Sequence, residues 1–130
     1  GCSSLTSVTI PENVTSIGNQ AFYGCSSLTS IAIGNGVTSI DWCAFSGCSS
    51  LTSITIPQNV REISTNAFED CSSLKEVYSY MKLPPESPTG LSHIFYRCFK
   101  LTTLYIPKNC KAKYTEANWS SYFSNIIEMD

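Results

Sequence analysis

Seven cysteines and a single histidine are the residues of this 130-residue chain with the strongest potential for chemistry. Thiols can form disulfides, bind zinc or act as nucleophiles, and their spacing indicates which. Five cysteines recur at one position of a repeating unit, and a sixth follows twelve residues after the last: Cys2, Cys25, Cys48, Cys71, Cys98 and then Cys110. This spacing predicts a line of thiols, whereas a zinc site needs ligands that converge on one point. We therefore expect no metal and no cofactor.

The same spacing favours a packing role for six of the seven cysteines. A free cysteine behaves as a small apolar side chain, and Cys110 falls where the other units have a valine. Stacked cysteines lie within disulfide reach, but side chains in register point the same way, which suits packing better than bonding. Cys43 departs from this column and matches the polar Gln20 and Asn66. We expect it to be a partly exposed thiol, and the one candidate for an intermolecular link.

No catalytic motif accompanies these residues. His93 has no placed partner, the carboxylates show no recurring spacing, and no nucleophile-elbow, metalloprotease or phosphate-loop motif is present. The net charge of −2 gives no general attraction for nucleic acid. No apolar run is long enough to insert into a membrane. These observations favour a protein that is not an enzyme and does not bind nucleic acid.

The thiols are positioned by an internal repeat of 23 residues. Residues 1–23 read GCSSLTSVTIPENVTSIGNQAFY, and two further units follow the same pattern. The apolar columns that keep this step begin at Leu5, Val8, Ile10, Val14, Ile17, Ala21 and Phe22. One such unit buries too little apolar surface to fold alone, so neighbouring units must stack and share a core.

Each unit predicts a strand, a second short extended stretch and a turn. Leu5, Val8 and Ile10 approach the alternation of a strand with one buried face. Pro11 has no N–H for a ladder and ends that strand. Residues 14–17 are a second extended stretch, and residues 20–22 predict a helical or 3₁₀ turn on the convex side. The predicted fold is a β-rich, right-handed solenoid with a parallel sheet of about five rungs.

The C-terminal half departs from the regular period. We expect one domain over residues 1–130, with three regular units in 1–70 and an irregular unit in 71–97 that contains a Pro-rich loop at 83–90. Residues 98–130 would supply the last strand and a cap, with a short helix at 111–118 and a final strand at 125–129. The opposite end of the stack is predicted to be uncovered, and the chain to be part of a longer protein.

The unit GCSSLTSITIPxxVTSIxxxAF resembles the BspA-like leucine-rich repeats of bacterial surface proteins. The ending, with Pro84 and Pro85, LYIPKNC at 104–110, Tyr114, Trp119 and a strand at 126–128, is also similar to that family's usual ending. The resemblance implies a leucine-rich-repeat solenoid, a location at the cell surface or in secretion, and, in some members, adhesion to host matrix proteins such as fibronectin or fibrinogen. It supplies no catalytic residue.

The binding surface is expected on the outward face of the strands. Two outward columns carry Ser7, Ser30, Ser53, Glu76 and Thr103, and Thr9, Ala32, Thr55, Tyr78 and Tyr105. Exposed tyrosines are favoured in interfaces, so the predicted patch comprises Tyr78 and Tyr105, with Lys75 and Glu76 at its rim and Tyr80 nearby. The same residues could instead only stabilise the sheet as cross-strand neighbours.

Three functions remain open from the sequence. The first is a surface module that binds a protein ligand through the strand face, and the second is a structural spacer within a surface protein. The third is carbohydrate binding, since aromatic rings on a flat sheet can stack on sugars. Trp42, which replaces Asn19 and Thr65 of the other units, would favour a second contact surface if exposed.

Overall fold

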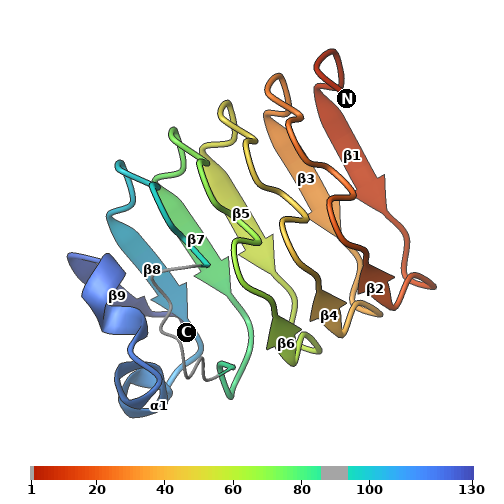
Figure 1. The fold of residues 1–130 in the computed structure, drawn as a ribbon. Coiled ribbons are helices and arrows are strands. Elements are labelled where there is room, and N and C mark those ends of the chain that lie inside the picture. Colours follow the sequence, from red (N-terminus) through yellow and green to blue (C-terminus); the bar gives the residue numbers. More distant parts are fainter. Residues whose placement is uncertain (1, 86–93) are drawn as a thin grey trace.

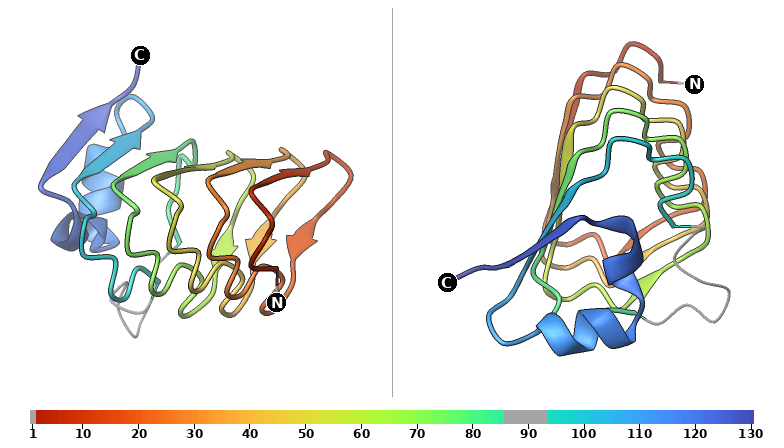
Figure 2. Two further views of the ribbon diagram at one scale, coloured as in Figure 1. Left: turned by 90° about the horizontal axis from the view of Figure 1, so that it is seen from above. Right: turned by 90° about the vertical axis from the view of Figure 1, so that its left-hand side faces the viewer.

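The computed structural model, which describes residues 2–85 and 94–130, is a stack of parallel strands (Figure 1). The long strands are β1 (Ser7–Ile10), β3 (Ser30–Ile33), β5 (Ser53–Ile56), β7 (Glu76–Ser79), β8 (Thr103–Ile106) and β9 (Asn125–Glu128). A second, shorter sheet consists of β2 (Ser16–Ile17), β4 (Ser39–Ile40) and β6 (Glu62–Ile63). Viewed along the stack, the chain winds as a coil with the long strands on one wall (Figure 2). The predicted solenoid is confirmed.

The 23-residue period sets the register of the strands. Ser7 pairs with Ser30, and Ser53 pairs with Glu76, so equivalent residues lie side by side. The inward columns form one continuous core, in which Leu28, Leu51 and Leu74 are fully buried. The rings of Phe22, Phe45, Phe68 and Phe95 stack along this core with centroids 5.3, 5.3 and 5.6 Å apart.

The predicted turn of each regular unit is present as i→i+3 turns and does not extend into a regular helix. Ala21 N–H donates to the Gly18 carbonyl at 3.1 Å and Tyr23 N–H to the Gln20 carbonyl at 3.2 Å, so turns follow one another without a regular helix. One residue in each of these turn segments has a positive φ angle, namely Gln20 (57°), Cys43 (56°) and Asn66 (63°). This left-handed conformation ends a right-handed helix wherever it occurs.

The long sheet has one break, between β3 and β5. The hydrogen-bonded strand orders are β1-β3 and β5-β7-β8-β9, whereas the short sheet is continuous as β2-β4-β6. At the strand ends, Gly34 N–H donates to the Ile10 carbonyl and Tyr80 N–H to the Ile56 carbonyl, both at 2.9 Å. The residue that would donate to the Ile33 carbonyl is Pro57, which has no N–H. Proline therefore removes the last bond of the ladder at this position.

The C-terminal residues cover the last rung, as predicted. Helix α1 (Lys111–Glu116) and the 3₁₀ helix η2 (Trp119–Tyr122) place the fully buried Tyr114 and Trp119 over the end of the core. The Trp119 ring meets Phe95 edge-on at 5.6 Å. At the opposite end, several apolar side chains of the first rung are only half-buried, among them Leu5, Val8 and Phe22. Most of the predicted Pro-rich loop, together with His93, lies outside the described residues.

Candidate binding surface

The predicted outward columns of the long sheet face solvent. In the first three rungs these columns carry only small exposed side chains, among them Ser7, Thr9 and Thr55. In the next two rungs they carry Tyr78 and Tyr105, which pair in register and are both half-buried. The outward face therefore has small side chains, mostly serine and threonine, in the first three rungs and a pair of aromatic rings in the next two.

The two tyrosine rings lie against each other. Their centroids are 4.4 Å apart and their planes differ by 4°, and the Tyr105 hydroxyl donates to Oε2 of Glu76 at 3.3 Å. Partial burial, and then the neighbouring Tyr78 and Glu76, raise the pKa of Tyr105 above its ordinary value. The Tyr105 hydroxyl therefore remains a neutral hydrogen-bond donor at physiological pH.

The stacking determines which parts of the rings a ligand can reach. One face of each ring is covered by the other ring, and the register partners on the outer sides are Thr55 for Tyr78 and Ile127 for Tyr105. The stacked faces are therefore closed to a ligand. Ile127 of β9 is 44% exposed and continues the column. The sequence interpretation missed it because no repeat marker fixes the register of β9.

The remaining predicted site residues lie at the ends of β7. Lys75 precedes the strand and is exposed, and its carbonyl accepts the N–H of Thr102 at 2.9 Å. Glu76 begins the strand and is bound by Tyr105 as described. Tyr80 follows the strand and is 48% exposed, but no hydrogen bond or ring contact joins it to the tyrosine pair. The structure thus joins Tyr78, Tyr105 and Glu76 by direct contacts, whereas Lys75 and Tyr80 are exposed at the two ends of β7.

Tyr80 instead lines a hollow at the break in the sheet. The hollow has a volume of about 360 Å³ and its lining residues are Ile33, Asn35, Thr55, Pro57, Gln58 and Tyr80. We call it the seam hollow. It lies on the C-terminal side of the tyrosine pair along the strands, and Thr55 belongs to both surfaces.

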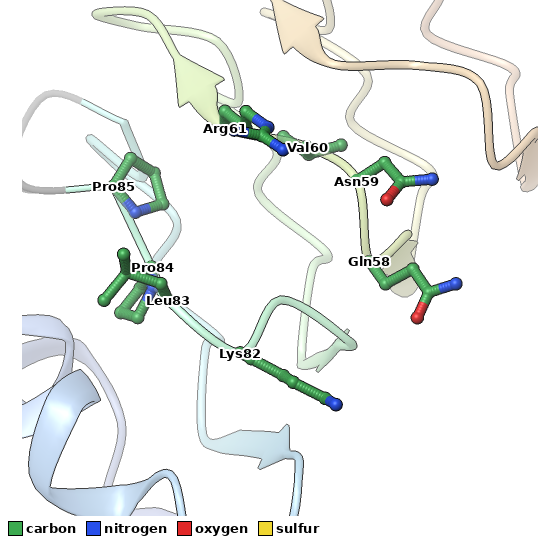
Figure 3. Close-up of a pocket in the computed structure, with 8 residues that line it drawn as sticks. All are labelled: Gln58, Asn59, Val60, Arg61, Lys82, Leu83, Pro84 and Pro85. Carbon is green, nitrogen blue, oxygen red and sulfur yellow. The ribbon is translucent and has the colours of Figure 1, made fainter.

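A larger groove of about 660 Å³ lies between the third and fourth rungs. In Figure 3, Gln58, Asn59, Val60 and Arg61 line one side, and Lys82, Leu83, Pro84 and Pro85 line the other. The chain continues from Pro85 into residues 86–93, outside the described part. We therefore assign no ligand to this groove.

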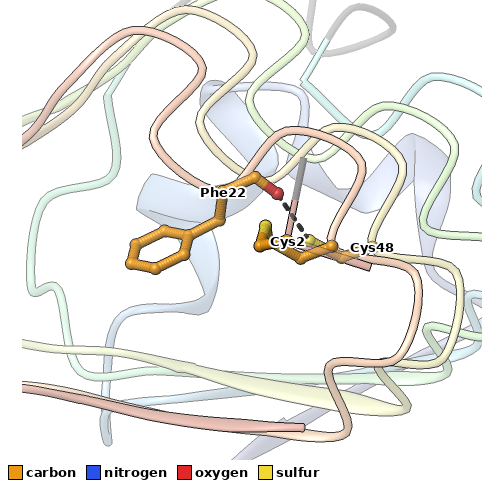
Figure 4. Close-up of a disulfide and its surroundings, with 4 residues drawn as sticks. Cys2, Phe22 and Cys48 are labelled. Carbon is orange, nitrogen blue, oxygen red and sulfur yellow. Dashed lines mark hydrogen bonds between the residues drawn. A yellow bond between two sulfur atoms is a disulfide. The ribbon is translucent and has the colours of Figure 1, made fainter. Parts of the chain in front are cut away.

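The cysteine column differs from the sequence prediction at one pair. Cys2 and Cys25, whose Cα atoms are 4.9 Å apart, form a disulfide (Figure 4), so the expectation of unpaired thiols throughout the column is wrong here. Stacked side chains in register can therefore bond when their sulfur atoms turn toward each other.

The other column cysteines are buried thiols, as predicted. Cys48, Cys71 and Cys98 each donate to the phenylalanine carbonyl of the preceding rung, at 3.4, 3.2 and 3.1 Å. These bonds hold the thiols in place along the core. Within residues 2–85 and 94–130, no group of three or more histidine, cysteine or acidic side chains could hold a metal ion.

Cys43 is buried, with 4% of its surface exposed, so its prediction as a partly exposed thiol is wrong. A rung is stacked on each side of it, and its short side chain does not extend beyond them, whereas the longer Gln20 of the first rung reaches solvent. Burial, and then Glu69, raise the pKa of Cys43, which further lowers its reactivity as a thiolate. Its role in an intermolecular link is not supported.

Trp42, on the wall opposite the long strands, is 46% exposed. Its backbone N–H donates to Oδ1 of Asn19 at 3.1 Å, so the main chain is fixed while the indole faces solvent. The sequence left open whether this side chain is exposed or buried, and exposure is the outcome that favours a second contact surface. In the described part of the chain, no helix is both long and apolar enough to cross a membrane.

Comparisons with known proteins agree with this geometry. The family model of the BspA type leucine rich repeat region matches six copies over residues 1–126. The fold is similar to that of a leucine-rich repeat protein from Eubacterium ventriosum ATCC 27560, with 24% identity and a TM-score of 0.70 over 95% of this chain and 33% of that one. No curated protein matches the chain.

Two further solved structures are similar. A leucine rich cell surface protein from Faecalibacterium prausnitzii A2-165 is 28% identical, with a TM-score of 0.62 over 96% of this chain and 38% of that one. A leucine-rich repeat protein from Bacteroides ovatus ATCC 8483 is 32% identical, with a TM-score of 0.52 over 85% of this chain and 34% of that one. The chain thus spans about a third of the length of these relatives.

Proposed function

The chain belongs to the BspA-type leucine-rich repeat family, and from this membership we propose that it is a non-catalytic module that binds a protein through its long sheet. The family and fold are typical of binding or structural modules. The observation that carries the proposal is the stacked pair of Tyr78 and Tyr105, 4.4 Å apart, next to three rungs whose outward side chains are small and uncharged.

The tyrosine pair has the properties of an interface anchor. Each ring supplies apolar area with few rotatable bonds, and stacking already restricts both side chains before a partner arrives. Ile127 extends the apolar strip, and Glu76 and Lys75 provide charges at its rim. A protein ligand can therefore bury the strip and pair its own polar groups around it.

We further propose that the module acts at the cell surface or in secretion, on host matrix proteins. The support for the location is the resemblance to the Faecalibacterium prausnitzii protein, which is described as a cell surface protein. The support for the partner is the family resemblance of the sequence. Fibronectin and fibrinogen are the two matrix proteins with which we test binding.

The test compares the binding of immobilised fibronectin and fibrinogen by the wild-type chain and by a Tyr78→Ser, Tyr105→Ser double variant. Loss of an anchoring pair of this kind costs about 2 kcal/mol or more, so we expect binding about 30-fold weaker. Tyr23→Ser is the matched control, since Tyr23 is 52% exposed and lies far from the strand face. Thermal melts establish that the variants remain folded.

Two outcomes contradict the proposal in different ways. Unchanged affinity of the double variant would remove the tyrosine pair as the binding site. No binding of either matrix protein by the wild-type chain would favour the alternative role, a structural spacer that holds other parts of a surface protein apart.

A further inference from the structure

The seam hollow lies where the long sheet is broken, and it exposes part of the backbone and of the core. Ile33 belongs to an inward column whose equivalents Ile10, Ile56 and Ile106 are buried, yet Ile33 is only half-buried and lines the hollow. Its carbonyl accepts no hydrogen bond from the residues that the structure describes, because the donor position is Pro57. The hollow thus offers an apolar floor and one unpaired acceptor.

The walls of the hollow carry polar side chains that are available for hydrogen bonds to a ligand. The side chains of Asn35, Thr55, Gln58 and Tyr80 have no hydrogen-bond partner among the described residues. Each of these amides and hydroxyls can both donate and accept. No charged side chain lines the hollow, and Glu12, which accepts the backbone N–H of Asn35, lies outside the lining.

We propose that the seam hollow binds a sugar ring of a neutral carbohydrate. Sugar hydroxyls both donate and accept, which matches the four uncharged polar side chains, and one of them can donate to the Ile33 carbonyl. The apolar C–H face of the ring can pack against the exposed ring of Tyr80, over the floor of Ile33 and Pro57. A volume of about 360 Å³ accommodates one such ring with its substituents.

The tyrosine pair is not part of this hollow. Tyr78 and Tyr105 stack on each other, and neither of them lines the hollow. Tyr80 stands outside that stack and is 48% exposed. The carbohydrate site is therefore distinct from the protein-binding surface, although the two share Thr55.

The experiment titrates ¹⁵N-labelled protein with four probes and follows backbone and side-chain amide resonances. Three probes are neutral tetrasaccharides, namely maltotetraose, cellotetraose and tetra-N-acetylchitotetraose, and the fourth is an anionic heparin tetrasaccharide. We expect at least one neutral probe to shift the side-chain amides of Asn35 and Gln58 and the backbone amide of Thr55. The heparin fragment should leave them in place, because the hollow holds no cation.

Variants then locate the site. Tyr80→Ser and Gln58→Ala replace exposed side chains and should each weaken binding of the active tetrasaccharide about tenfold. Tyr23→Ser, with similar exposure in the first rung, should bind as the wild type does. The Tyr78→Ser, Tyr105→Ser variant should also keep the sugar, so failure of the protein-binding proposal is distinguishable from failure of this one.

Three results would overturn the inference. These are no shift with any neutral probe at millimolar concentration, unchanged affinity in both Tyr80→Ser and Gln58→Ala, and shifts at the hollow with heparin alone. If a tyrosine- or proline-rich peptide occupied the hollow while no sugar did, the hollow would instead hold an anchor side chain of a protein ligand.

Discussion

Ser79 and Tyr114 share a hydrogen bond inside the core, which joins strand β7 to the capping helix α1. Tyr114 donates its hydroxyl proton to the Met81 carbonyl, so Ser79 must donate to the tyrosine oxygen. The Met81 N–H in turn donates to Oγ of Ser79 at 3.3 Å. Both side chains are fully buried. Ser79 occupies a position where the other long strands before the cap carry isoleucine. A closed ring of hydrogen bonds therefore attaches the cap to the solenoid.

Tyr114→Phe should destabilise the chain by about 1–3 kcal/mol, because it leaves the Met81 carbonyl and the Ser79 hydroxyl buried without this partner. Urea unfolding followed by circular dichroism measures the difference. Tyr122→Phe is the control, since the half-buried Tyr122 hydroxyl has no hydrogen bond to any residue that the structure describes. Equal free energies of unfolding for the two variants would contradict a role of the ring in holding the cap.

Phe45→Ala should be far more costly than Phe22→Ala, although both residues occupy the same column. Phe45 is fully buried between two phenylalanine rings at 5.3 Å, whereas Phe22 has a ring on one side only and is half-buried. Removal of a buried phenylalanine costs about 3–5 kcal/mol, and a partly exposed one costs less. Similar midpoints of thermal unfolding would show that the stack is not packed as described.

The cysteines should divide into two groups in an alkylation experiment, the five free thiols and the two of the disulfide. The five free thiols are all buried, so iodoacetamide should modify none of them in the native chain. In denaturant without reductant we expect five labels, and after reduction seven, counted by mass spectrometry. Seven labels without reductant would exclude the disulfide between Cys2 and Cys25.

The stability of the chain should decrease in alkaline solution. Burial raises the pKa of Cys48 from 9.0 to about 11, and the Cys98 thiol together with burial raises the pKa of Cys71. A group with a higher pKa in the folded chain stabilises it fully below the unfolded pKa and loses that contribution as the pH rises. We therefore expect the Tm to fall between about pH 9 and pH 11.

The matched variant for this experiment is Cys48→Ala, Cys71→Ala, which lacks the two thiols. Its Tm should fall less over the same pH range, since both chains share their other titrating groups. An equal fall in the two chains would show that the buried thiols do not contribute.

The period alone predicted much of the fold and of the candidate surface. Identical steps between Leu5, Leu28 and Leu51 require these residues to share one column. Tyr78 and Tyr105 are 27 residues apart, and they align because each stands seven residues after the cysteine of its unit. The alternation of apolar residues then separates the inward columns from the outward ones. The identity of the cap was also accessible, because large apolar residues such as Trp119 gather after the last regular strand.

Other features depended on neighbours that the period does not specify. Cys43 appeared exposed by analogy with Gln20, yet its burial depends on the rungs stacked at its sides. The disulfide of Cys2 and Cys25 depends on side-chain rotation, since the next two pairs in the column have the same 23-residue spacing and are not bonded. Ile127 could be assigned to the surface only once β9 had paired with β8.

The break between β3 and β5 shows what the repeat period determines and what depends on tertiary packing. Pro57 occupies the same repeat position as Pro11 and Pro107, yet β7 and β8 still pair in register. A repeating sequence determines which residues lie at the same level of the stack, because each unit is displaced along one axis by one rung. The period does not determine whether neighbouring backbones approach closely enough to form hydrogen bonds, or which groups they leave open to a ligand. Both depend on the packing of all rungs together, so only the tertiary structure decided them.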